Sequence, residues 1–213
     1  MKILNLYACL GGNRYKWEDN HDITAVEWDK ELARLYQERF PKDKVIVADA
    51  HQYLLNYYKE YDFIWSSPPC PSHSRINISQ YTRDNWTPRY PDMALYQEVI
   101  FLDNYYKGQY VVENVIPFYE PLIPAKKRGR HLYWCNFRLP NTLSKRKNPD
   151  LSRTKNLIDA MSEFHDYDFK KYKGKQRMNK IARNLVDYEA GKTILDTAMG
   201  IMTKQDTKQT ELW

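Results

Sequence analysis

The first 115 residues alternate short apolar runs with longer amphipathic ones, and this rhythm restricts the chain to a small set of folds. The apolar runs predict strands at 2–8, 22–28, 44–49, 61–66 and 109–113, and the segments between them predict helices at 29–40, 51–59 and 92–106. Strands joined through helices are typical of a parallel sheet. The sequence therefore predicts an α/β fold, which binds ligands beyond the carboxyl ends of its strands.

The pattern changes after residue 116. Residues 128–140 (RGRHLYWCNFRLP) show the aromatic alternation of one or two strands, and the chain then becomes basic and polar. Residues 187–202 predict a further helix, followed by a polar tail that we expect to fray. We therefore expect three parts. Residues 1–137 form a large first domain, and residues 138–182 form a small basic region. Residues 183–213 form a C-terminal helix that returns to the first domain and ends in the tail.

The composition limits the kind of protein this can be. Among 213 residues, 33 Lys and Arg stand against 27 Asp and Glu, and the net charge of +6 is mild evidence for a polyanionic partner. Cys9, Cys70 and Cys135 form no CxxC pair, so we expect neither a disulfide framework nor a metal site. No run approaches the ~18 apolar residues that span a bilayer, and the first residues do not resemble a signal peptide. We therefore expect a cytoplasmic protein without a membrane partner.

One loop carries the strongest chemical signal. Residues 66–74 (SSPPCPSHS) directly follow the predicted fourth strand, so Cys70 is expected on a proline-stiffened loop at the ligand-binding edge of the sheet. A thiolate there is a strong nucleophile. The alternative, a buried and unreactive cysteine, is equally consistent with this loop taken alone.

The order of motifs around this loop resembles that of the DNA cytosine-C5 methyltransferase family. The family's proline-proline-cysteine loop corresponds to Pro68-Pro69-Cys70, and its glutamate-asparagine-valine motif corresponds to Glu113-Asn114-Val115. The other elements of the family pattern correspond, in the family's order, to Leu6–Gly12, Glu27-Trp28, Asp49 and Arg128-Gly129-Arg130. The resemblance covers residues 3 to about 135 and extends weakly to 183–195, whereas 138–182 match nothing in the family, which normally carries a much longer target-recognition region there.

This resemblance implies both a fold and an activity. The implied fold class is α/β, a Rossmann-like S-adenosylmethionine-dependent methyltransferase sheet in the catalytic and cofactor-binding domain 1–137, with a small basic target-recognition region at 138–182. The implied activity is methyl transfer to C5 of cytosine in DNA through a covalent cysteine–C6 intermediate. Because the target atom is inaccessible in a stacked duplex, the implied partner is double-stranded DNA with a flipped cytosine.

The resemblance also implies catalytic roles. Cys70 would add to C6 of the base, and Glu113 would share a proton with N3 as electron density enters the ring. Arg130 would hold O2 and the developing negative charge, with Arg128 supporting it or a phosphate. Proton loss from C5 and elimination of the cysteine would then release the product.

The implied cofactor is S-adenosylmethionine, with S-adenosylhomocysteine as its product. Gly11 and Gly12 would let the backbone approach the methionine end, and Glu27 would accept hydrogen bonds from the ribose hydroxyls. Trp28 would pack on adenine, and Asp49 would accept from its amino group. The resemblance places the remaining cofactor-binding positions at Tyr7, Ala8, Pro68 and Asn184.

Basic residues are the candidates for contacts with phosphates. The predicted nucleic-acid-binding residues are Ser74, Lys126, Lys127, Lys145, Arg146 and Lys147, and a merely solvated basic face is the alternative for any one of them. His73 is either a base or phosphate contact or an incidental loop histidine. The chain departs from the family pattern at Asn5, Cys9, Pro71 and Lys126, and we expect the Cβ of Cys9 to crowd the cofactor.

The sequence leaves other functions open. A tRNA cytosine-C5 methyltransferase branch shares the motif order, and an amino-methyltransferase would need an aromatic residue where Cys70 stands. A degenerate family member could bind DNA without methylating it, as Asn5, Cys9 and the short recognition region suggest. The small size is typical of a phage-like or accessory enzyme in a bacterial or phage-infected cell, and whether a restriction enzyme accompanies it is not encoded in these residues.

Overall fold

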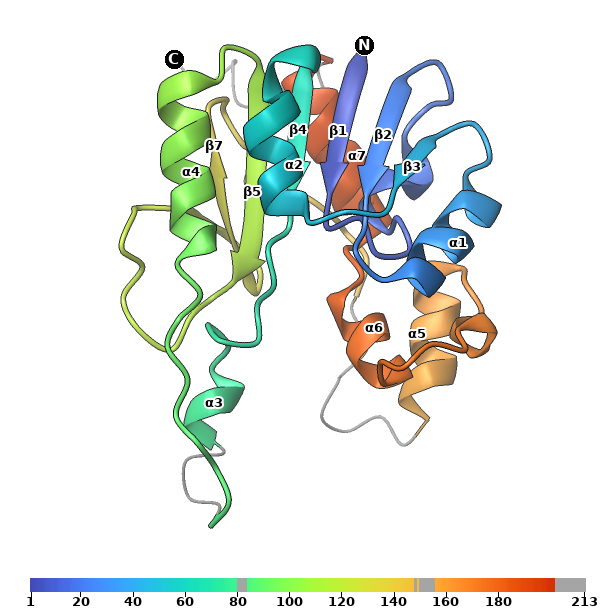
Figure 1. Cartoon of the computed structure of the whole chain (residues 1–213), viewed down its shortest axis with the longest axis vertical. Coiled ribbons are helices and arrows are strands. Elements are labelled where there is room, and N and C mark those ends of the chain that lie inside the picture. Colours follow the sequence, from blue (N-terminus) through green and yellow to red (C-terminus); the bar gives the residue numbers. More distant parts are fainter. Residues whose placement is uncertain (80–83, 148, 150–155, 202–213) are drawn as a thin grey trace.

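A seven-stranded sheet forms the centre of the computed structural model, which describes residues 1–79, 84–147, 149 and 156–201 (Figure 1). The strand order is β3-β2-β1-β4-β5-β7-β6. The strands, in chain order from β1 to β7, are Lys2–Leu6, Asp22–Val26, Lys44–Ile46, Phe63–Ser66, Gln109–Val115, Lys126–Arg128 and His131–Cys135. The first five strands are parallel, β7 is antiparallel to β5, and β6 is antiparallel to β7. The predicted α/β fold is confirmed. Of the one or two aromatic strands expected in 128–140, the structure has β7, and the basic strand β6 comes before it.

Helices cover both faces of this sheet. The α-helices, from α1 to α7, are Lys30–Arg39, Ala50–Tyr57, Ile76–Ser79, Ala94–Tyr105, Leu157–His165, Met178–Asn184 and Tyr188–Ala198, and the 3-10 turns η1 to η3 are Asn13–Lys16, Tyr58–Glu60 and Phe169–Lys171. Aspartates begin three of the α-helices, because Asp29, Asp49 and Asp187 accept backbone N–H groups at the starts of α1, α2 and α7. Within the described ranges, no helix is long and apolar enough to cross a membrane.

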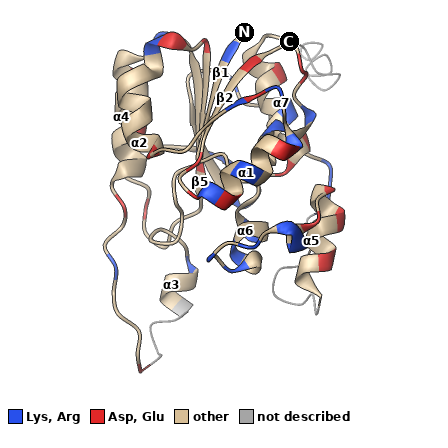
Figure 2. Cartoon of the chain, turned by 45° about the vertical axis from the view of Figure 1, so that its right-hand side comes forward, with Lys and Arg blue, Asp and Glu red and all other residues tan. Residues whose placement is uncertain are grey.

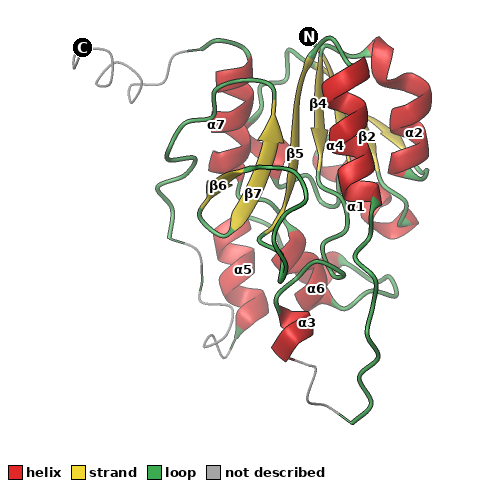
Figure 3. Ribbon diagram, turned by 90° about the vertical axis from the view of Figure 1, so that its left-hand side faces the viewer, coloured by secondary structure: helices red, strands yellow, loops and turns green. Residues whose placement is uncertain are grey.

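Two hydrophobic cores lie on opposite faces of the sheet. On one face, α2 and α4 pack through Leu54, Val99 and Leu102 against the strands. On the other face, Ile194 and Leu195 of α7 pack with Trp17 and Trp65. Figure 3 shows α7 on one side and α2 with α4 on the other. Burial in these two cores stabilises the sheet. The loops at the carboxyl ends of its strands carry the candidate site.

A small helical lobe lies beyond the carboxyl edge of the sheet. It consists of α5, η3 and α6, and sequence analysis did not predict these helices or the short α3 (Figure 1). The lobe packs on α1 through a third core that joins Leu32 and Leu35 to Met161, Phe169 and Ile181. The basic region therefore contains two α-helices and a 3-10 turn where it is described. Its residues 148 and 150–155, and the predicted tail from 202, lie outside the described residues.

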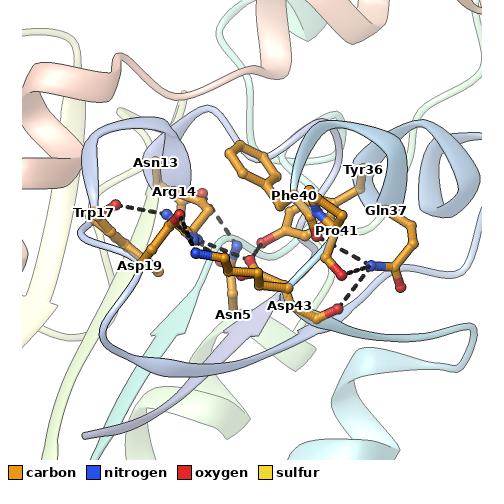
Figure 4. A network of polar contacts seen from close by, with 11 residues as sticks. Asn5, Asn13, Arg14, Trp17, Asp19, Tyr36, Gln37, Phe40, Pro41 and Asp43 are labelled. Carbon is orange, nitrogen blue, oxygen red and sulfur yellow. Dashed lines mark hydrogen bonds and ion pairs between the residues drawn. The ribbon is translucent and has the colours of Figure 1, made fainter.

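A buried polar network holds the loop after β1 in place (Figure 4). Arg14 donates from Nε and Nη2 to the two carboxylate oxygens of Asp43, at 2.9 and 3.1 Å, and both side chains are almost fully buried. Tyr36 donates to the same carboxylate at 2.9 Å. Asn5 and Asn13 pair through their amides, with Asn13 donating at 2.8 Å. The loop that leads into η1 is thus tied to the β2–β3 side of the sheet.

Candidate active site

A cavity of about 320 Å³ opens at the carboxyl ends of the parallel strands. It lies where the strand order reverses between β1 and β4, which is where open α/β sheets bind ligands. Three groups of residues line it. They are the loop after β1 with Glu27 and Trp28, the Cys70 loop with Glu113 and Asn114 of β5, and a wall from the helical lobe that includes Gln176, Lys180 and Asn184.

The loop after β1 has an unusual backbone. Tyr7, Cys9 and Gly11 all have positive φ, at 56°, 48° and 67°, so left-handed residues alternate along it. Gly11 is followed by a right-handed Gly12, and such pairs turn successive N–H groups toward an anion. A Cβ on Gly12 would lie 2.3 Å from the carbonyl oxygen of Val186, so only glycine allows this close approach.

Glu27 directly follows β2 and lines the cavity. Its Oε2 accepts from the Cys9 N–H and its Oε1 from the Asp29 N–H, both at 2.9 Å, which fixes the orientation of the carboxylate. Burial raises the pKa of Glu27, and the backbone donors oppose this shift. Each oxygen keeps acceptor capacity for a hydroxyl, because a carboxylate oxygen has two lone pairs. Trp28, 65% exposed, lines the cavity beside it.

Most of the other predicted cofactor residues also line this cavity. Tyr7, Ala8, Pro68 and Asn184 do so, whereas Gly11 and Asp49 are not among the lining residues. The Asp49 carboxylate accepts from the Gln52 N–H at the start of α2. Cys9 lines the cavity, and burial raises its thiol pKa, so the side chain that replaces the family's glycine is a neutral thiol on the cavity wall.

Cys70 lies half-buried in the same cavity. Its loop is anchored to β5 because Asn114 Nδ2 donates to the Pro68 carbonyl at 2.9 Å, and the N–H groups of His73 and Ser74 both donate to the Cys70 carbonyl. Burial raises the pKa of the Cys70 thiol to about 11 and Glu113 adds to this, while Lys180 and Arg130 act in the opposite direction. The resting thiol is therefore protonated near neutral pH.

Glu113 is buried at the cavity wall opposite the lobe. Its Oε1 lies 3.4 Å from Nε2 of His131, a β7 residue that also lines the cavity and that sequence analysis did not single out. Burial lowers the pKa of His131, and this effect outweighs the attraction of Glu113. The imidazole is therefore neutral near neutral pH and can exchange a hydrogen bond with the carboxyl group.

The two predicted catalytic arginines lie outside the lining of this cavity. Arg128 donates to the carbonyl oxygens of Pro140, at 2.5 Å, and Leu139, at 3.0 Å, so it braces the chain after β7 rather than facing Cys70. Arg130 is exposed, lines a second cavity, and lies near enough to lower the pKa of Cys70. The structure thus brings Cys70 and Glu113 together and leaves Arg128 elsewhere.

The predicted phosphate-binding residues divide into two groups. Lys126 donates to the carbonyl oxygens of Cys135 and Phe137, at 2.9 and 2.7 Å, and Arg146 pairs with Asp187 at 2.9 Å, so both have partners within the chain. The exposed members are Lys127, Lys145 and Lys147. Figure 2 shows Lys and Arg positions on the lobe around α6, below the sheet.

The histidine and the serine beside the nucleophile are structural in this geometry. His73 is fully buried, and its Nδ1 lies 2.5 Å from the Tyr119 hydroxyl, which agrees with the interpretation of an incidental histidine. Ser74 Oγ accepts from the Ile76 N–H at 3.3 Å, and its backbone bridges to Pro117. In the part of the chain that the structure describes, no cluster of three or more His, Cys, Asp and Glu side chains could hold a metal ion.

Together, the largely parallel sheet and its cavity define an α/β protein that binds a ligand at the carboxyl ends of its strands. Residues 1–118 match the sequence model of the family described as C-5 cytosine-specific DNA methylase. The match spans more than half of the 213 residues, and the chain belongs to that family. A search of curated proteins finds no match.

Three solved structures illustrate the similarity. A mutant of Spodoptera frugiperda DNMT2 is 26% identical over 54% of this chain and 35% of that chain, with a TM-score of 0.38, so the chain spans about a third of that structure. A putative DNA modification methyltransferase from an E. coli prophage is 17% identical over 56% and 33%, with a TM-score of 0.37. The Entamoeba histolytica methyltransferase EhMeth is 9% identical over 96% and 99%, with a TM-score of 0.49.

The family implies S-adenosylmethionine as the cofactor. The donor set at the cavity fits this molecule. The backbone of Gly12, which lines the cavity, suits its carboxylate, the fixed carboxylate of Glu27 suits a pair of ribose hydroxyls, and the exposed face of Trp28 suits adenine.

Proposed function

We propose that this chain methylates C5 of cytosine in double-stranded DNA, with Cys70 as the nucleophile. One observation carries the proposal, because Cys70 and Glu113 line the same cavity as Glu27 and the loop after β1. A nucleophile and a cofactor-binding loop in one cavity are what methyl transfer to an unreactive ring carbon requires. The family match supports cytosine C5 as the acceptor.

S-adenosylmethionine supplies an electrophilic methyl group when it is bound. The Cys70 thiolate would add to C6 of the cytosine, which makes C5 nucleophilic. Glu113 would hold a proton at N3 and so stabilise the ring as electrons enter it. His131 Nε2 would keep the Glu113 carboxyl group in position, since the two lie 3.4 Å apart. Loss of the C5 proton would then allow elimination of Cys70 and restore the ring.

The resting protonation of Cys70 supports a substrate-assisted step. Its pKa of about 11 leaves little thiolate near neutral pH, so the thiol must give its proton to water as its sulfur adds to C6 of the bound base. Lys180 and Arg130 oppose the effect of burial and lower the pKa of Cys70. The lobe that carries Lys180 would therefore contribute to catalysis as well as to recognition.

The division of the chain follows from these roles. We propose residues 1–137 as the catalytic and cofactor-binding domain and 138–182 as the target-recognition region. The exposed Lys127, Lys145 and Lys147 would contact phosphates, which gives sequence-independent and salt-sensitive affinity. The α7 helix packs on the sheet and completes the catalytic domain.

Transfer of a labelled methyl group tests this function. The protein is incubated with labelled S-adenosylmethionine and either mixed-sequence duplex DNA or tRNA, and the nucleosides are then separated. We expect 5-methylcytosine in the DNA, and we expect its loss in Cys70→Ala but not in Cys135→Ala, a cysteine outside the cavity. Label in tRNA alone would move the substrate to RNA, and label in neither by a protein that binds the cofactor would indicate a degenerate binder.

A further inference from the structure

A second cavity, of about 210 Å³, adjoins the proposed active site. The two cavities share His131, Leu185 and Val186 as a common wall. The β6–β7 turn, residues 141–146, the end of α5 and the start of α7 form the remainder of the second cavity. The proposed function assigns no role to this space.

His165 at the end of α5 is the unexplained group in this cavity. The side chain is only 2% exposed, and within the described ranges neither ring nitrogen has a hydrogen-bond partner. Its ring packs edge-on against Phe164 and Phe169, which hold it in place. A buried imidazole with two unpartnered nitrogens is rare in a native protein, because burial of unsatisfied polar atoms is costly. The cavity that it lines would supply the missing partner.

The charges around His165 indicate which partner fits. Arg128, Arg130 and Arg146 line the cavity, and the one acidic side chain among the lining residues, Asp187, is already paired with Arg146 at 2.9 Å. The Arg146 guanidinium is clamped between the rings of Phe164 and Tyr188, at 3.9 and 3.8 Å. The Arg130 side chain has no hydrogen-bond or ion-pair partner among the residues described. The side chains that line this cavity therefore carry a net positive charge, and guanidinium groups match the oxygens of a phosphate.

We propose that this second cavity binds a backbone phosphodiester of the nucleic-acid strand that carries the target base, through Arg130 and His165. This inference rests on the proposed function for the identity of the strand. The shared wall supports it, because a phosphate in the second cavity would lie next to a base in the first. Burial, together with the positive charges of Arg146, Arg39 and Arg130, lowers the pKa of His165 to about 3. The negative charge of a bound anion would counter these positive charges.

Histidine resonances measured by NMR test the site without cofactor or methyl acceptor. The full chain is titrated with dimethyl phosphate, a mimic of the phosphodiester, and in parallel with inorganic phosphate, and the His165 signal is assigned by its loss in His165→Gln. We expect dimethyl phosphate to shift the His165 resonances saturably, and Arg130→Gln to weaken this binding about tenfold. Lys107→Gln, an exposed cation that does not line the cavity, should leave the affinity unchanged.

An internal control comes from His21, whose Nδ1 is also buried without a partner but which precedes β2 at the opposite edge of the sheet. Its resonances should not move with either phosphate. An unresponsive His165, or a response that survives unchanged in Arg130→Gln, would overturn the inference. A response to inorganic phosphate but not to dimethyl phosphate would also overturn it, because the site would then bind free phosphate.

Duplex DNA supplies the last arm of the experiment. We expect it to shift the same His165 resonances and to be displaced from them by dimethyl phosphate. If His165 responds in this way but the protein methylates neither DNA nor tRNA, the proposed function fails and the phosphate site stands. If methyl transfer occurs while His165 is unaffected by DNA, the proposed function stands and the phosphate site fails.

Discussion

The reactivity of Cys70 with iodoacetamide should report its environment directly. Burial and Glu113 raise the pKa of this thiol to about 11. In the free protein at pH 8 the thiolate is then about one part in a thousand, and alkylation should accelerate about tenfold per pH unit until about pH 10. An unperturbed cysteine would level off soon after its pKa of about 8.5. Mass spectrometry of the peptides separates Cys70 from Cys9 and Cys135.

Two charge variants should move this profile in opposite directions. Glu113→Gln removes a negative charge that raises the Cys70 pKa, so alkylation at pH 8 should become faster. Lys180→Gln removes a positive charge that lowers the pKa, so alkylation should become slower. The control is Lys175→Gln, an exposed lysine of the same lobe that does not line the cavity. A plateau below pH 9, or identical profiles in all three variants, would refute this account of the site.

Three further predictions concern stability and cofactor binding. Arg14→Ala should lower the free energy of unfolding by about 3–5 kcal/mol and Tm by about 6–20 °C, because it leaves the buried Asp43 carboxylate without its cation. Arg34→Ala, at an exposed arginine, should change Tm little, and equal shifts in the two variants would contradict the argument. Gly12→Ala should destabilise the fold by about 1–3 kcal/mol through its clash with the Val186 carbonyl, and an unchanged Tm would contradict this. Calorimetry should show that Glu27→Ala weakens S-adenosylmethionine binding at least tenfold, because two ribose hydroxyls lose a charged acceptor. The control is Glu38→Ala, an exposed carboxylate that does not line the cavity, and equal affinities of the two variants would exclude the role of Glu27.

The sheet could be predicted from the sequence because its determinants are local. Each parallel strand is a short apolar run, and residues such as Leu4, Ile64 and Val112 face cores that any α/β packing would require. The helical lobe was missed for the opposite reason. Its apolar residues, such as Met161 and Ile181, are interrupted by charged segments, and they become buried only against Leu32 and Leu35 of a distant helix.

The site was predictable where a motif fixes a residue near a strand end. Cys70, Glu113 and Glu27 meet in one cavity because β4, β5 and β2 end at the same edge of the sheet. Arg128 and Lys126 differ, because loop carbonyls that come later in the chain satisfy their donors. The sequence shows that β6 carries cations, but it does not show their partners. These partners depend on how the chain after β7 folds back onto β6.

Two residues show what a family pattern alone does not convey. Cys9 adopts a positive φ of 48°, so the backbone of this loop keeps the left-handed conformation that glycine favours although the side chain has changed. His131 follows the arginine motif directly, and its antiparallel pairing opposite Val115 brings its ring to Glu113. That pairing is a long-range contact, and the signal that could have found it is the period of alternation within β7.

The most direct test of the central claim is covalent trapping on DNA in which 5-fluorocytosine replaces cytosine. Fluorine cannot leave C5 as a proton does, so a cysteine that adds to C6 and is followed by methyl transfer stays attached. With S-adenosylmethionine present, we predict an adduct that survives denaturation and whose peptide maps to Cys70, and we predict none with Cys70→Ala. An adduct at another residue, or methylation of ordinary DNA without any trapped complex, would contradict Cys70 as the nucleophile.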